Sequence, residues 1–255
     1  MPRIVTQPTP LCFSVATSGV ILLAATISWA AGALPTVCLI GLALLPPALY
    51  GLQHLTGLAA AGLWLFSLGL SFFIATYRPE NFHYPLIHHF TELKFELHLN
   101  LAKVLTGYLL LAWLWQQGSS KRLELCLPLS LASSTAIIVT AWWLFNYQWD
   151  PKWPNGIWWF LAINLGATVI AEEAFFRLGL QKSVLQMTGS SPFAVIFSAA
   201  VFVLAHAPKD VASALLFSLA GLTYGLVYNY TGRFSAAVLT HFTVNALHFS
   251  LLSYP

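Results

Sequence analysis

The sequence predicts an all-α protein, a polytopic transmembrane helical bundle with eight or nine spans. Of the 255 residues, 58% are hydrophobic and 7% are charged, whereas about 25% of the residues in soluble domains are charged. The mean hydropathy is +0.74. So little polar surface excludes a soluble domain, and the small net charge of +3 argues against nucleic acid as a partner. We therefore expect a multi-pass protein in the lipid bilayer of the cell membrane.

The elements follow from breaks at proline, glycine or clustered charges, which separate about nine apolar runs. Most runs are close to the length of about 20 residues that crosses a bilayer as a helix. In chain order they are 11–31, 36–53, 57–77, 99–116, 125–147, 157–187, 192–207, 211–230 and 234–252. Only a few residues around His54 separate the second run from the third, so eight spans and nine spans both fit. We expect two parts, N-terminal transmembrane helices in 1–156 and a C-terminal transmembrane core in 157–255, to which the residues discussed below assign the site.

The longest polar interruption covers residues 78–100 and has its own pattern. From Leu86 onward, leucine, isoleucine and phenylalanine recur at helical spacing among histidines and charged residues. That pattern is typical of a helix lying on a membrane surface. We therefore predict a surface amphipathic helix near 78–98.

Two adjacent carboxylates, Glu172 and Glu173, lie inside the sixth apolar run. A charge at that depth costs about 3 kcal/mol on insertion scales, and it marks a functional site. Glu173 and Arg177 are four residues apart with the acid first, so they are predicted to form an ion pair on one helix face. Glu172 points about 100° away. It has no partner within its own helix, which makes it the candidate proton-transfer group.

Polar side chains in two later runs are predicted to lie at the depth of Glu172 or within a turn or two of it. Glu172 and His206 both lie about 22–24 Å from the turn at 188–191, because each helical residue rises about 1.5 Å. A helical hairpin would therefore bring them to one height. His241 and Asn245 are four residues apart in the last run and share one face. Each of these groups alone could serve helix packing, but their compatible depths favour a catalytic site.

Three ordered motifs resemble the signature of a known family. They are Glu172-Glu-x-x-x-Arg177, Phe202-x-x-x-His206 and His241-x-x-x-Asn245. This set is similar to the CPBP family, the CAAX prenyl protease and bacteriocin-processing (abortive-infection-like) intramembrane endopeptidases. The resemblance covers about 157–252. One departure is Leu178, which stands where the family usually has glycine.

The resemblance implies hydrolysis of a peptide bond inside the membrane. The residues to which it assigns the site are Glu172, Glu173, Arg177, His206, His241 and Asn245. Glu172 with His206 would activate a water molecule, and His241 with Asn245 would stabilise the oxyanion. The acid–arginine pair would fix the helix and the local field. The implied substrate is a membrane-embedded or lipidated peptide or protein, with processing of CAAX, bacteriocin or C-terminal sorting-tail type.

Other functions use the same residues. Glutamates and histidines are plausible zinc ligands, so a metal-dependent membrane protease is one alternative. No H-E-x-x-H motif is present, and Glu172 and Glu173 cannot both point at one ion, so we favour a mechanism without metal or cofactor. A non-catalytic bacteriocin-immunity protein is a second alternative. A proton-coupled transporter ranks last, because the duplicated broken-helix pattern of many transporters is missing from the sequence.

Overall fold

The chain is mostly helical in the computed structural model, which describes residues 10–115 and 122–253. The helices are α1 (Leu11–Ala30), α2 (Thr36–Leu52), α3 (Gly57–Thr76), α4 (Leu101–Leu114), α5 (Leu123–Phe145), α6 (Ile157–Ile163), α7 (Ile170–Glu173), α8 (Lys182–Thr188), α9 (Ser191–His206), α10 (Val211–Thr231) and α11 (Phe234–Leu251). Every predicted apolar run forms helix within a few residues of its expected limits. Of the two predicted parts, the start of the first (residue 1) and the end of the second (residue 255) lie outside the described residues.

Within the described residues, five helical stretches are long and apolar enough to cross a membrane, judged by length and composition. They are α1, α3, α5, the continuous stretch Ile157–Thr188 and α10. Three further apolar helices, α2, α4 and α9, are shorter than 18 residues. Length and composition therefore support several spans, and this criterion alone does not reach the predicted eight or nine.

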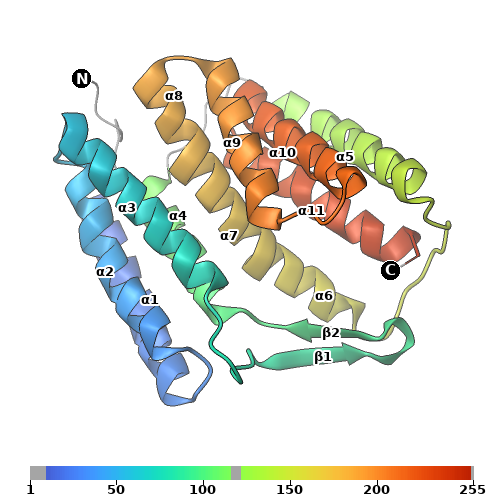
Figure 1. Cartoon of the computed structure of the whole chain (residues 1–255), viewed down its shortest axis with the longest axis horizontal. Helices are drawn as coiled ribbons and strands as arrows, with labels where there is room; N and C mark the ends of the chain where they lie inside the picture. Colours follow the sequence, from blue (N-terminus) through green and yellow to red (C-terminus); the bar gives the residue numbers. More distant parts are fainter. Residues whose placement is uncertain (1–9, 116–121, 254–255) are drawn as a thin grey trace.

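The long helix Ile157–Thr188 runs through the middle of the molecule (Figure 1). Helices α1–α4 lie on one side of it, and α5 and α9–α11 lie on the other. Two π-helical segments, η2 (Asn164–Val169) and η3 (Ala174–Gln181), interrupt it on either side of α7. A π-helical turn holds more residues than an α-helical turn, so it rotates the side chains that follow, and such segments are frequent at functional sites.

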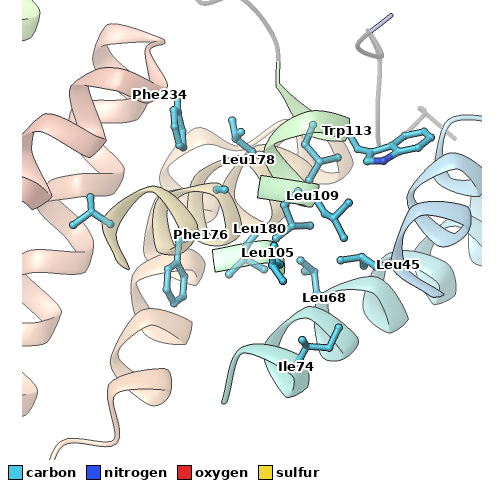
Figure 2. Close-up of a cluster of buried hydrophobic side chains, with 14 of the residues drawn as sticks. Leu45, Leu68, Ile74, Leu105, Leu109, Trp113, Phe176, Leu178, Leu180 and Phe234 are labelled. Atoms are coloured by element: carbon cyan, nitrogen blue, oxygen red, sulfur yellow. The ribbon is translucent and has the colours of Figure 1, made fainter. Parts of the chain in front are cut away.

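Helix α4 is packed in the centre of the hydrophobic core (Figure 2). Its buried side chains lie between those of α2 and α3 on one side and those of η3 on the other. The labelled residues are Leu45 of α2; Leu68 and Ile74 of α3; Leu105, Leu109 and Trp113 of α4; and Phe176, Leu178 and Leu180 of η3. Gly107 lets α4 approach α7 closely, because a Cβ added there would lie 2.4 Å from Cα of Ala171. Small residues at such crossings allow the backbones of membrane helices to touch.

A β-hairpin replaces the surface helix predicted near 78–98. Strand β1 (Leu86–Phe90) pairs antiparallel with β2 (Phe95–His98), and the short 3₁₀ helix η1 (Thr91–Leu93) joins them. In β2 the side chains alternate, with Leu97 buried and both Glu96 and His98 exposed, which is the two-residue period of a strand. The hairpin's apolar face packs against α6 and α11, in a cluster made of Phe90, Leu97, Ile157, Phe160 and Phe249. The prediction of a helix was wrong because this alternation, supported by tertiary packing, prevails over the weak helical pattern.

Candidate active site

The adjacent carboxylates of α7 point in different directions, as their helical positions predict, and share only His241 as a neighbour. Glu173 is completely buried, and its Oε2 accepts a hydrogen bond from Arg177 Nε at 2.9 Å. The predicted ion pair is therefore confirmed, although the backbone between the two residues is π-helical. Glu172 has a side chain that is 14% exposed and points to another set of neighbours.

Arg177 is the centre of a buried network that joins five elements, α7, η3, α9, α10 and α11. Its Nη1 donates to Gln181 Oε1 at 2.7 Å and to Ser198 Oγ of α9 at 3.4 Å. Gln181 Nε2 in turn donates to the carbonyl oxygen of Gly225 in α10 at 2.9 Å. Gly225 also leaves room for the guanidinium, since a Cβ there would lie 2.9 Å from Arg177 Nη1. Through Glu173 the same network reaches α11, so it holds the helices that carry the candidate site.

Glu172 has no partner within its own helix, as predicted, but it is paired with a lysine from another helix, which the sequence analysis did not predict. Its Oε1 accepts a hydrogen bond from Lys103 Nζ at 2.5 Å, and the lysine comes from α4, 69 residues earlier in the chain. Its Oε2 faces two imidazoles, with His241 Nε2 at 3.7 Å and His206 Nε2 at 3.9 Å. One carboxylate oxygen is therefore held by an ammonium group, and the other points to both predicted histidines.

His206 has one fixed hydrogen bond and one free ring nitrogen directed at Glu172. Its Nδ1 is 2.8 Å from the carbonyl oxygen of Phe202. A carbonyl oxygen only accepts, so Nδ1 carries the proton and Nε2 of the neutral ring is an acceptor. The 3.9 Å from Nε2 to Glu172 Oε2 is too long for a direct hydrogen bond. Contacts of this length are commonly bridged by a water molecule. The predicted meeting of these two side chains at one height is confirmed.

His241 lies between the two carboxylates. Its Nδ1 donates to Glu173 Oε1 at 2.9 Å, while its Nε2 is 3.7 Å from Glu172 Oε2. The ring of Tyr224 stacks on it, with centroids 4.5 Å apart and an interplanar angle of 17°. The imidazole is therefore fixed in orientation from both its edge and its face, and it is only 5% exposed.

Asn245 lies one turn beyond His241 on α11. Its Nδ2 donates to Oδ1 of Asn164 in η2 at 3.3 Å, so one N–H of the carboxamide is occupied and the second N–H is available to another acceptor. The residue lines the same cavity as Glu172 and both histidines. The bridging role of an intramembrane asparagine and a role at the site are thus compatible.

Two cavities are both lined by the Glu172–His206 pair. The first, here called the α4 cavity, has a volume of about 260 Å³ and lies between α3, α4, α7, η3 and α9. The second, here called the α5 cavity, has a volume of about 430 Å³ and lies between α5, η2, α9, α10 and α11. Glu172 and His206 line both cavities, whereas Lys103 lines only the first and His241 with Asn245 only the second. An extended chain bound across both cavities would pass the carboxylate.

The sequence prediction missed three polar residues of this region. Lys103 was identifiable, because it is the one charge in the apolar run 99–116 and intramembrane charges mark functional sites. Asn164 and Gln181 carried no comparable signal. Their positions relative to Glu172 depend on the π-helical segments, which a regular helical period does not describe.

Comparison with known proteins shows that the segment carrying this site is similar to a known family. Residues 153–247 match the family described as Type II CAAX prenyl endopeptidase Rce1-like. No curated protein and no solved structure matches the chain. The matched segment begins just before α6 and ends within α11, so it contains all six residues predicted from the sequence motifs. Lys103 of α4 lies outside it.

Proposed function

We propose that this protein is an intramembrane peptidase. The premise is that its residues 153–247 belong to the Rce1-like family of type II CAAX prenyl endopeptidases. Membership implies an intramembrane protease, and five helical stretches long and apolar enough to span a membrane agree with it. In our proposal, α2, α4, α9 and α11 complete a bundle of nine spans in the cell membrane, or of eight if α2 and α3 count as one. The site buried in this bundle hydrolyses a peptide bond of a membrane-embedded or lipidated protein.

The observation that carries the proposal is the convergence on Glu172 Oε2 of two imidazole nitrogens, at 3.7 and 3.9 Å, beside two cavities that Glu172 lines. A water molecule between Oε2 and His206 Nε2 would donate one hydrogen bond to each. As the water oxygen attacks the scissile carbonyl carbon, its proton moves to Glu172. General base catalysis of this kind contributes about 10²–10⁴-fold to the rate.

The negative charge that develops on the carbonyl oxygen needs hydrogen-bond donors. Asn245 has one N–H to offer. His241 supplies a second donor when its Nε2 is protonated, and Glu173, accepting from Nδ1, stabilises that imidazolium. Losing one such donor costs about 10²–10³-fold in kcat. When the C–N bond breaks, the proton held by Glu172 passes to the leaving amine nitrogen, which restores the carboxylate.

The substrate can be identified directly from the peptides that the protein cleaves. The test compares the membrane peptidome of cells producing the wild-type chain with that of cells producing Glu172→Gln. We expect a peptide pair, a precursor and its shortened product, in which the product is present only with the wild type. An unchanged peptidome at equal protein levels would favour the non-catalytic, immunity-type alternative.

Treatment with a chelator separates the metal-free mechanism from the metal-dependent alternative. Among the described residues, no group of three His, Cys, Asp or Glu side chains is spaced to hold a metal ion. The Lys103 ammonium next to Oε1 also opposes a second cation on Glu172. We therefore expect the rate of cleavage to survive dialysis against EDTA and 1,10-phenanthroline. Loss of cleavage, restored by added Zn²⁺, would contradict this prediction.

A further inference from the structure

Lys103 is a partly buried cation that the mechanism above does not use. It lies in α4, on the wall of the α4 cavity, and its side chain is 25% exposed. A lysine in an apolar helix is retained when it has a partner, and its partner in the structure is Glu172 Oε1 at 2.5 Å. The contact links the N-terminal helices to the segment that matches the family.

The packing of α4 accounts for this contact. Gly107 is four residues after Lys103, on the same helix face, and Ala171 immediately precedes Glu172. Because Gly107 has no side chain, the backbones of α4 and α7 touch at Ala171. The lysine is thereby held one turn away from the crossing, within reach of the glutamate.

The charges around Glu172 show why a cation is needed there. The carboxylate of Glu173 is neutralised by Arg177 at 2.9 Å. Glu172 also has two imidazoles near Oε2, but neither is a permanent charge: His206 Nε2 accepts a hydrogen bond in the proposed mechanism, and His241 is charged only while its Nε2 carries a proton. Lys103 is thus the fixed positive charge that balances the second carboxylate, since an unpaired buried charge costs several kcal/mol.

A direct role in binding the substrate's C-terminus does not fit the distances. An extended tripeptide leaving group carries its terminal carboxylate about 10 Å beyond the scissile carbon. Lys103 Nζ is instead 2.5 Å from the carboxylate that acts on that carbon. The ammonium is therefore a neighbour of the reacting centre and not of the distant chain end.

We propose that Lys103 is a positioning residue that holds Glu172 ionised, with Oε1 fixed so that Oε2 faces His206 and His241. The expected effect on catalysis rests on the proposed function, whereas the effect of Lys103 on the charge of Glu172 can be tested without it. Misplacing a catalytic group by about 1 Å lowers the rate by about 10²-fold. The expected effect of losing Lys103 is therefore on kcat, with KM retained.

The first test needs no substrate. Dicyclohexylcarbodiimide is an apolar reagent that reacts with protonated carboxyl groups, and mass spectrometry of labelled native membranes resolves Glu172 from Glu173. We expect little labelling of Glu172 in the wild type and in Lys103→Arg, and several-fold more in Lys103→Met. Glu173, completely buried beside Arg177, serves as the folding control within the same peptide. Labelling of Glu172 that does not rise in Lys103→Met, or that rises together with labelling of Glu173, would overturn the proposal.

The second test uses the precursor peptide recovered from the peptidome comparison and the full chain in lipid nanodiscs. We expect Lys103→Met to lower kcat about 10- to 100-fold with little change in KM, and Lys103→Arg to restore most of the rate. Lys209→Met, the same substitution at an exposed position, is the matched control. A raised KM with unchanged kcat would assign Lys103 to substrate binding and overturn the inference. Cleavage retained by Glu172→Gln would instead refute the proposed function, whatever Lys103 does.

Discussion

Glu172→Gln is expected to lower kcat for the precursor peptide by about 10²–10⁴-fold, because the amide keeps the side-chain volume but cannot accept the proton of the attacking water. His206→Ala should have an effect of similar size, since the water would lose one of its two acceptors. Both rates are measured by single-turnover cleavage with purified protein in nanodiscs. Near-normal cleavage by either variant would remove the basis of the mechanism.

A double variant tests whether the two groups act on one water. Groups that act as a unit have non-additive effects on the rate, so Glu172→Gln/His206→Ala is expected to be about as inactive as the slower single variant. Additive losses would mean that the two side chains act at separate steps. Glu92→Gln makes the same substitution at an exposed residue of the hairpin and should cleave at the wild-type rate.

The parts of this site that the sequence predicts are those set by spacing within a helix or across one short turn. The pairing of Glu173 with Arg177 follows from their separation, and the meeting of Glu172 with His206 follows from equal distances to the turn before α9. Both depend only on the rise and period of a helix. The mostly helical fold is predictable for a similar reason, because composition and run length determine it.

The parts that the sequence did not predict depend on how distant elements pack. The approach of Lys103 to Glu172 requires the crossing of α4 over α7 at Gly107, and no local pattern encodes that crossing. The position of Asn164 beside Asn245 depends on π-helical winding. The hairpin was missed because its strands are short and are supported by contacts with α6 and α11.

Arg177→Met is expected to produce the largest loss of stability, about 3–5 kcal/mol, because it leaves the carboxylate of Glu173 buried without its cation. Gln181 and Ser198 would also lose their donor in the core. The free energy of unfolding is measured by titration with SDS in mixed micelles. The matched control is Arg78→Met, since Arg78 is exposed and surface substitutions usually change stability by less than about 0.5 kcal/mol.

The double variant Glu173→Gln/Arg177→Met distinguishes the cost of an unpaired charge from the loss of packing. When both charges are removed, no uncompensated ion remains from this pair, so the double variant should be more stable than Arg177→Met alone. His241 would still have a hydrogen-bond acceptor in the amide oxygen of the introduced glutamine, so its ring orientation should be retained. If the two losses of stability simply add, the stability of this region depends on the packing of the two side chains and not on the contact between their charges.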